Sequence, residues 1–400
     1  MVSYKVLQKR IERDKERKQA NREKIGRVYD RLENVFTPRN FIQAYWKCRR
    51  GTSYKLSVQR YGKKPLSKIL PAMRKARAGI VPPISSSKKV VIRERGKERI
   101  ITPIRIADRV VQRVLCDNAL VPMVERRLIY DNGASRKGKG IAFARRRFNI
   151  MLERAKAKWG NDFYCLTFDF KNFFASVPHA LCYDELKKVF ADMQLVDVCM
   201  QVIESYQMRD ARMAGDMEEM VRLKRHEGIG ICLGSQVSQV MALSAPNRID
   251  HLMKDVLGIH EMIRYMDDGV MLHQDREFLV RVLEALREAV KKAGLRLNEK
   301  KTRISHIRHG LSFMKVRYHL RGMTTVKRIA KTGIVRMRRR LRKLGEKVRL
   351  RLVDMDSVYN SVQSWASHAK CGMSWRTRRN ILIEYERMYG EYDGFRRVCL

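Results

Sequence analysis

The sequence predicts an α+β protein in which two or three subdomains share one cleft. Of its 400 residues, 44% are hydrophobic, which is ample for a sizeable core. Short apolar, β-prone runs at 163–170 and 261–272 predict strands, whereas the segments 39–80 and 334–348 carry apolar residues at helical spacing. No internal repeat and no long Gly/Ser linker is visible.

The chain begins with a basic N-terminal extension, residues 1–38. Its charge-dense middle fits an exposed helix or a partly disordered arm, and it fits an RNA grip as well as a solvated helix without a specific role. Helical patterning follows over 39–80. The alternating segments 89–93 and 98–101 then predict a β-hairpin, whose basic residues can neutralise the charge of a triphosphate.

A Gly-rich basic loop at 132–140 precedes a predicted helix at 141–156. Its backbone amides can cradle phosphate, and Arg136, Lys137 and Lys139 are candidates for nucleic-acid contact. The spacing of a nucleotide-binding P-loop is absent, so a flexible basic turn explains this loop equally well.

Three aspartates are the candidate chemical groups. Tyr265-Met266-Asp267-Asp268 lies between two short apolar runs, which predicts a tight hairpin with adjacent carboxylates at its tip. Alone, this pair fits a solvated turn. Asp169, however, ends the run 163–170, where a central strand would open into a site. Adjacent carboxylates repel each other, and this repulsion disfavours their ionisation. A protein usually keeps such carboxylates together because they bind a divalent cation.

A two-metal mechanism fits this carboxylate set. Ions about 3.5–4 Å apart activate a primer 3′-hydroxyl and stabilise the leaving pyrophosphate, and carboxylates from different strands bridge the ions. We therefore predict that Asp169, Asp267 and Asp268 are the catalytic residues and hold two Mg²⁺ ions, with Mn²⁺ as a substitute.

The charge balance indicates the partner. Eighty-six Lys and Arg against forty-two Asp and Glu leave a formal net charge of +44, which calls for a polyanion such as nucleic acid. No segment approaches the roughly 18–20 apolar residues of a membrane-spanning helix, and the N-terminus lacks the apolar core of a signal peptide. We expect a cytoplasmic protein with reduced, packed cysteines and no membrane partner.

Two further regions have the sequence pattern of a ligand-binding turn and of a nucleic-acid-binding helix. The glycine-rich run 228–239, followed by a predicted helix over 240–257, lets backbone approach a ligand closely. Between 321 and 352 the chain has thirteen basic residues and one acid, and apolar residues recur at helical spacing from Ile334 to Val348. One helix face should pack while the other touches phosphates. The candidate contacts are Arg336, Arg338, Arg339, Arg340, Arg342 and Lys343.

Together these motifs resemble a reverse transcriptase over roughly residues 40–370, in the family's order. The matching blocks are Asp169 with Phe170 to Ser176, the signature Tyr265 to Asp268, Arg99 with Asp108-Arg109 in the fingers, Gly234 to Gln239, Lys301, and the primer grip Leu311 to Val316. The resemblance implies a right-hand polymerase with an α-helical basic thumb. Its expected parts are fingers at 39–160 with part of the palm, a palm at 161–320 with a helical insertion at about 180–226, and a thumb at 321–400.

The resemblance also implies roles for single residues. Phe174 matches an aromatic ring that excludes a 2′-hydroxyl, although a packed core aromatic is the alternative. Lys301 matches a lysine proposed to protonate the leaving pyrophosphate, with an ordinary surface lysine as the alternative. The remaining expectations are the backbone of Phe170 as a metal ligand, Lys97, Arg99, Leu233, Gly234 and Gln239 at the nucleotide, and Tyr265 and Met266 at the nucleic acid.

One departure from the family pattern indicates which kind of reverse transcriptase this chain resembles. Many relatives have Gln-Gly-x-x-x-Ser-Pro, whereas this chain has Leu233 to Gln239 as Leu-Gly-Ser-Gln-Val-Ser-Gln. That form resembles prokaryotic diversity-generating and defence-associated enzymes.

We therefore expect an RNA-directed DNA polymerase that copies a cognate structured non-coding RNA, in a bacterial anti-phage defence or related retroelement system. Its partners would be that RNA, the RNA/DNA duplex and deoxynucleoside triphosphates, and an accessory protein or a homo-oligomer is left open. A diversity-generating retroelement enzyme with an accessory subunit is the alternative. A non-catalytic RNA-binding protein is the alternative of another class.

Overall fold

The computed structural model describes residues 29–82, 90–94, 97–205, 228–322, 324–329, 331–372 and 375–390. Most of the basic N-terminal extension and the second half of the expected insertion at 180–226 lie outside the described residues. The side chains of Lys97 and Arg99 lie outside them as well. None of the helices in the described part is both long and apolar enough to cross a membrane.

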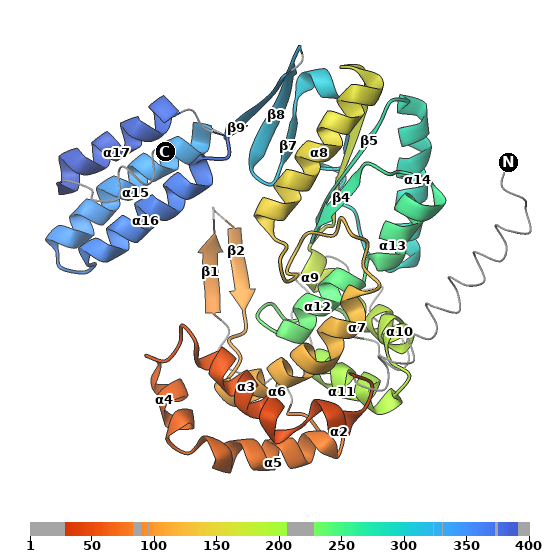
Figure 1. Cartoon of the computed structure of the whole chain (residues 1–400), viewed down its shortest axis with the longest axis vertical. Helices are drawn as coiled ribbons and strands as arrows, with labels where there is room; N and C mark the ends of the chain where they lie inside the picture. Colours follow the sequence, from red (N-terminus) through yellow and green to blue (C-terminus); the bar gives the residue numbers. More distant parts are fainter. Residues whose placement is uncertain are drawn as a thin grey trace, which may run out of the picture. The chain divides into compact units, whose positions relative to one another are not determined.

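The chain divides into two compact units that alternate along the sequence. The first contains residues 1–140, 168–269 and 281–302, and the second contains 141–167, 270–280 and 303–400. Figure 1 shows their elements in sequence colours.

The first unit begins with helices, and those within residues 39–80 agree with the helical patterning that the sequence shows there. They are α2 (Leu32–Val35), α3 (Pro38–Arg49), α4 (Leu56–Lys63), α5 (Pro65–Arg77), α6 (Ile106–Leu115), η1 (Cys116–Leu120) and α7 (Val121–Glu125). Helix α3 starts where it does because Thr37 Oγ1 accepts from the amide of Asn40 and proline occupies the first turn. The apolar face of α6 is buried, and α3, α4 and α5 all pack against this helix.

The expected hairpin between these helices is confirmed. Strands β1 (Val90–Glu94) and β2 (Lys97–Ile101) pair antiparallel, with Val90 opposite Ile101 and Glu94 opposite Lys97.

The rest of the first unit surrounds the glycine-rich run. Its helices are α9 (Phe173–Ser176), α10 (His179–Val189), α11 (Met193–Glu204), α12 (Gln236–Ser244), α13 (Asn247–His251) and η4 (Leu252–Val256). The sequence predicted one helix over 240–257, and this was wrong in two respects. The helix begins earlier because Ser235 caps it, accepting from the amide of Ser238, and it is interrupted near Pro246.

Four strands form the central sheet in the order β4-β5-β3-β6. Their bounds are β3 (Tyr164–Asp169), β4 (Met262–Tyr265), β5 (Asp268–His273) and β6 (Arg303–His306), and α14 (Arg276–Lys292) follows β5. Strands β3 and β6 are antiparallel, with Tyr164 opposite His306. The division between the units falls within β3 and β5, so the aspartate ends of both strands belong to the first unit.

The second unit contains a helix packed on a three-stranded sheet. Helix α8 (Ile141–Trp159) carries the buried Phe148, whose ring lies 5.0 Å from that of Phe313 and 4.9 Å from that of Tyr318. The strands are β7 (Leu311–Phe313), β8 (Val316–Arg321) and β9 (Thr324–Ile329), and the short helix η5 (Ile307–His309) precedes them.

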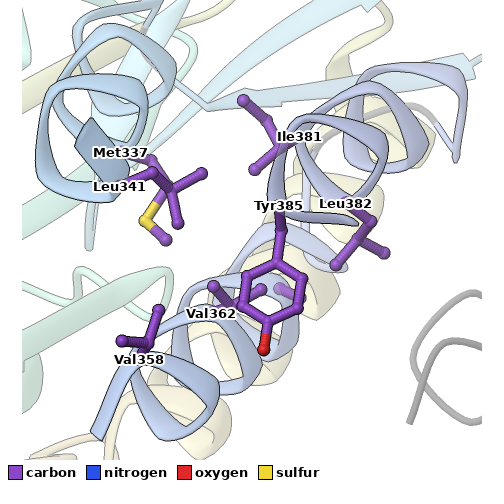
Figure 2. Packing of buried hydrophobic residues seen from close by; sticks show 8 residues of the cluster. Met337, Leu341, Val358, Val362, Ile381, Leu382 and Tyr385 are labelled. Atoms are coloured by element: carbon purple, nitrogen blue, oxygen red, sulfur yellow. The ribbon is translucent and has the colours of Figure 1, made fainter. Parts of the chain in front are cut away.

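Three C-terminal helices form a bundle with its own core. They are α15 (Lys331–Arg349), α16 (Met355–Ala369) and α17 (Trp375–Tyr389). Figure 2 shows Met337 and Leu341 of α15 directed toward side chains of the other two helices. Ile334, Leu344 and Val348 pack partly buried against the same core, which confirms the apolar face predicted from helical spacing.

Candidate active site

Three aspartates lie together at the place where β3 ends and its neighbour in the sheet, β5, begins. Asp169 is the last residue of β3, and Asp268 is the first residue of β5. Asp267 lies in the two-residue turn between β4 and β5, as the sequence predicted. The backbone amide of Phe170 donates to the carbonyl of Asp267 at 3.1 Å, which ties this turn to the end of β3.

A glycine allows this close approach. The ring of Phe168 occupies the space beside Gly269, and a Cβ built at Gly269 would lie 2.1 Å from that ring. Any other residue would push the ring away, because its Cβ would overlap the ring. Gly269 therefore keeps Asp268 close to Asp169.

Asp169 is bound by two side chains from the loop that precedes β6. Its side chain is 6% exposed, and its Oδ2 accepts from Lys301 Nζ at 2.6 Å. The other oxygen, Oδ1, accepts from Asn298 Nδ2 at 3.1 Å. The amide of Asn298 also donates to the backbone carbonyl of Asp169 at 2.7 Å. The loop thus fixes both the side chain and the backbone of this aspartate.

The site is electrostatically crowded. Burial, the charge of Asp267 and the contact with Asp169 raise the pKa of Asp268 to about 7, and Lys301 only partly opposes them. For Lys301, burial would lower the pKa, but the hydrogen bond to Asp169 and the surrounding carboxylates raise it overall. Lys301 is therefore protonated at neutral pH and supplies the positive charge nearest the three carboxylates.

The carboxylates have the chemistry of a divalent-cation site. Within the described residues, no group of three or more His, Cys, Asp or Glu side chains is arranged as a ready metal site. The donor set nevertheless fits a hard cation, because oxygen ligands are available and a cation would relieve the repulsion that raises the pKa of Asp268. Asp169, Asp267 and Asp268 are the residues that would hold it.

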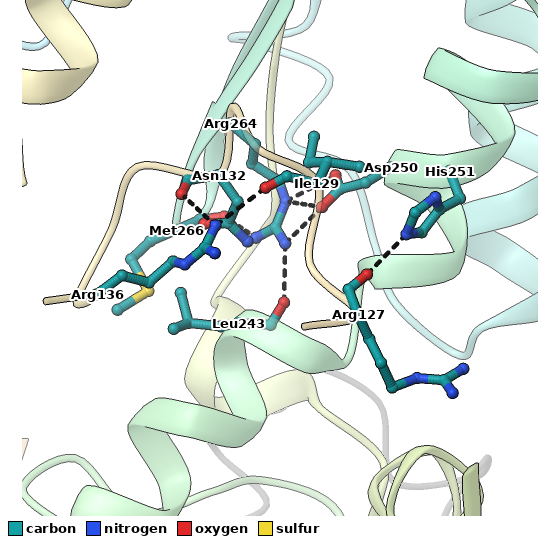
Figure 3. A network of polar contacts seen from close by, with 9 residues as sticks. All are labelled: Arg127, Ile129, Asn132, Arg136, Leu243, Asp250, His251, Arg264 and Met266. Carbon is teal, nitrogen blue, oxygen red and sulfur yellow. Dashed lines mark hydrogen bonds and ion pairs between the residues drawn. The ribbon is translucent and has the colours of Figure 1, made fainter. Parts of the chain in front are cut away.

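A buried ion pair is hydrogen-bonded to Met266, the residue before Asp267 (Figure 3). Arg264, at 0% side-chain exposure, donates to both carboxylate oxygens of Asp250 at 2.7–2.8 Å. Its two terminal nitrogens also donate to backbone carbonyls, one to that of Met266 at 2.8 Å and the other to that of Leu243 at 2.9 Å. Met266 has φ +55°, a left-handed conformation that a non-glycine residue adopts only at a cost. Arg264 therefore links a helix pair to the turn that carries Asp267.

The Gly-rich basic loop is held by its own arginine. Arg136 donates to the carbonyls of Ile129, Asn132 and Glu125 at 3.0–3.2 Å, and its side chain is only 11% exposed. Figure 3 shows it directed into this network. The guanidinium of Arg136 is thus engaged by backbone oxygens, and its nucleic-acid contact stays a prediction. Lys137 is exposed, and the ammonium of Lys139 lies over the ring of Tyr130 at 4.4 Å.

The glycine-rich turn before α12 has the close backbone approach that its sequence indicated. Gly234 has φ +118°, and a Cβ there would lie 3.0 Å from the carbonyl oxygen of Thr102. The amide of Thr102 donates to the carbonyl of Leu233 at 3.4 Å, which joins the turn to the end of β2. Leu233 is half-buried and Gln239 is exposed.

Two neighbouring phenylalanines have different environments. Phe173 is buried and stacks on Phe170 with ring centroids 5.2 Å apart. Phe174 is half-buried and meets Phe173 edge-on at 5.9 Å. Phe174 therefore keeps part of its ring at the surface, unlike a fully packed core residue.

On α15, five of the six candidate basic residues are exposed: Arg336, Arg339, Arg340, Arg342 and Lys343. Arg338 differs because it pairs with Glu384 of α17 at 2.7 Å.

Sequence reasoning missed Asn298, Arg264 and Asp250. The only local signal for Asn298 is its place three residues before Lys301. For Arg264 the signal was a charge within the apolar strand 262–265, since a buried charge needs a partner, and Asp250 has no comparable local signal.

The reverse transcriptase (RNA-dependent DNA polymerase) family model matches residues 87–331. The chain therefore belongs to this family, as the resemblance of its motifs implied. Together with the mixture of helices and strands, this confirms the α+β right-hand polymerase fold. No curated protein matches the chain.

Telomerases are among the solved structures similar to this chain. Telomerase from Candida albicans in complex with the TWJ fragment of telomeric RNA matches with a TM-score of 0.45 and 12% identity, covering 80% of this chain and 63% of that one. Apo telomerase from Candida tropicalis matches with a TM-score of 0.44 and 13% identity, covering 84% of this chain and 70% of that one. The chain thus spans less than two thirds of the first of these relatives.

Proposed function

We propose that this protein is an RNA-directed DNA polymerase whose catalytic residues are Asp169, Asp267 and Asp268. The observation that supports this most directly is the convergence of these carboxylates, with Lys301 Nζ 2.6 Å from Asp169, inside a chain of the reverse transcriptase family.

The three aspartates would hold two Mg²⁺ ions, with Mn²⁺ as a substitute and the backbone carbonyl of Phe170 as a further ligand. When bound, the ions would activate the primer 3′-hydroxyl and neutralise the leaving pyrophosphate. The protein's own residues do the positioning: Asn298 orients Asp169, and Arg264 holds the turn of Asp267. Lys301, protonated at neutral pH, is the residue that can give a proton to the leaving pyrophosphate.

The incoming deoxynucleotide would lie near Phe174 and the Gly234 turn. The partly exposed ring of Phe174 would exclude a 2′-hydroxyl. Leu233, Gly234 and Gln239 would line the same site, together with Lys97 and Arg99 of the β1–β2 hairpin. Tyr265, Met266, Lys137, Lys139 and the exposed basic face of α15 would contact the template RNA and the RNA/DNA duplex.

For the biological role, we propose a cytoplasmic prokaryotic enzyme that copies a cognate structured RNA in an anti-phage defence or related retroelement system. The departure at Leu233 to Gln239 supports this type. A diversity-generating retroelement enzyme with an accessory subunit shares that feature. A neighbouring variable-protein gene with a template repeat would favour the second role, and sequencing the RNA and DNA that copurify with the protein would identify the template.

Extension of a labelled primer on an RNA template, with Mg²⁺ and deoxynucleotides, tests the activity. We expect extension by the natural chain and none by the variant with Asp267→Ala and Asp268→Ala. Full activity in that variant would refute the catalytic assignment. RNA binding without extension in the natural chain would favour a non-catalytic RNA-binding protein.

A further inference from the structure

The segment that contains α3, α4 and α5 has no acidic residue of its own, although Lys47 within it pairs with Asp117 of η1 at 2.7 Å. Residues 35–82 contain twelve Lys and Arg residues and no Asp or Glu, and all twelve basic side chains are exposed. By contrast, the exposed face of α14 mixes basic residues with Glu277, Glu284 and Glu288. A stretch of one sign of charge on a folded surface favours a polyanionic partner.

An exposed tryptophan lies on this surface in a fixed position. Trp46 of α3 is 56% exposed, and its ring packs against that of the buried Tyr45 at 5.4 Å. Tyr45 in turn packs against the buried Tyr61 of α4 at 5.5 Å. On Trp46 itself, the guanidinium of Arg49 lies 5.2 Å from the ring centroid. Trp46 is thus an exposed ring on a rigid aromatic base, with a cation beside it.

A second aromatic follows in the turn between α3 and α4. Tyr54 is 73% exposed, and Lys55 Nζ lies 6.0 Å from its ring centroid. The start of this turn is anchored, because a terminal nitrogen of Arg109 on α6 donates to the carbonyl of Cys48 at 2.6 Å and to Thr52 Oγ1 at 3.2 Å. The chain leading to both exposed rings is therefore held to the body of the first unit.

We propose that Trp46 and Tyr54, with Arg49, Arg50 and Lys55, bind a single-stranded segment of RNA apart from the aspartate site. Every base has a face that can stack on an aromatic ring, and basic residues between the rings neutralise the phosphates. A duplex fits less well because its base faces are covered. This inference does not rest on polymerase activity, since such a surface binds RNA whether or not the chain polymerises.

The test is the anisotropy of a labelled 20-nucleotide poly(U) RNA titrated with the full chain, without divalent metal or deoxynucleotides. Replacing Trp46 with Ala should weaken binding about fivefold or more, which corresponds to the loss of one stacked base. Trp46→Phe, which keeps a ring, should retain most of the affinity. Tyr183→Ala is the matched control, because Lys187 lies over that ring at 4.5 Å but also pairs with Asp184.

The charged part of the surface has its own readout. Replacing Arg49, Arg50 and Lys55 with Gln should flatten the slope of log affinity against log salt by about two units, at about 0.7 per phosphate of a single strand. The same change at Arg281, Lys291 and Lys292 of α14 should leave the slope unaltered. Equal affinity of Trp46→Ala and the natural chain would overturn the proposal. So would an equal loss of affinity for a duplex in Trp46→Ala, or a loss confined to binding of anionic phosphatidylserine vesicles.

The outcome is separable from that of the proposed function. The variant with Asp267→Ala and Asp268→Ala should bind poly(U) like the natural chain, because its stacking surface is intact. If the natural chain extends primers while Trp46→Ala binds normally, the stacking surface is wrong and the polymerase assignment stands.

Discussion

Arg264 and Asp250 form a buried, bidentate ion pair next to the turn that carries Asp267. Burial raises the pKa of Asp250, while the charge and hydrogen bonds of Arg264 oppose that rise. Arg264 also reaches the carbonyl of Met266 at 2.8 Å, so the pair connects the protein interior to the candidate catalytic turn.

Substitution of this pair separates stability from catalysis. Removing one partner should cost about 3–5 kcal/mol in the free energy of unfolding, whereas Arg264→Met with Asp250→Leu should restore much of it, because no buried charge remains. The double variant still lacks the donor to Met266, so we expect its kcat to stay at least tenfold low while KM changes little. Thermal unfolding and primer extension check this. Recovery of both stability and kcat in the double variant would reduce Arg264 to a structural role.

The raised pKa of Asp268 predicts a pH-dependent gain in stability on its removal. The folded-state pKa is about 7 against an ordinary value of 3.8, so ionisation opposes folding increasingly as pH rises between these values. Without divalent metal, Asp268→Asn should therefore have a higher Tm than the natural chain, with a gap that widens from about pH 4 to pH 7 and then stays constant. Thermal unfolding in EDTA measures it. A gap independent of pH would contradict the crowded carboxylate site.

Phe174 is expected to select the sugar. Replacing it with Val should raise ribonucleotide incorporation at least tenfold and spare deoxynucleotide use, because only the extra hydroxyl meets the ring. Phe173→Leu is the control, since that ring is buried against Phe170 and its loss should lower Tm without changing sugar choice. Single-nucleotide extension with each triphosphate gives the ratio. An unchanged ratio in Phe174→Val would mean that the ring only packs.

The exposed basic face of α15 is expected to bind phosphates. Changing Arg339, Arg340 and Lys343 to Gln should flatten the slope of log affinity against log salt for a primer–template duplex by about 2.7 units, at about 0.9 per phosphate of a duplex. Arg338→Gln should instead lower Tm and affect the slope little, because Arg338 pairs with Glu384. Salt titrations of binding distinguish the two. An unaltered slope in the triple variant would mean that this face is merely solvated.

Local patterns were enough to predict the hairpin of Asp267 and Asp268, the strand that ends at Asp169, and the packed face of α15 with Met337 and Leu341. Each depends on periodicity or turn chemistry within about ten residues, where side-chain spacing alone decides which face is buried. The glycine-rich turn at Gly234 was predictable for the same reason, although the start of the helix after it was misjudged because the cap at Ser235 was not recognised.

Tertiary structure decided which side chains surround those aspartates. Lys301 and Asn298 reach Asp169 across more than a hundred residues of chain, and Arg264 meets Asp250 from another element. Arg136 of the basic loop donates to the backbone carbonyls of Ile129 and Asn132, a pairing that its charge alone did not predict. Such outcomes depend on which donors and acceptors meet after the chain folds, and burial then makes their pairing obligatory. The periodicity of the sequence does not predict these contacts between distant residues.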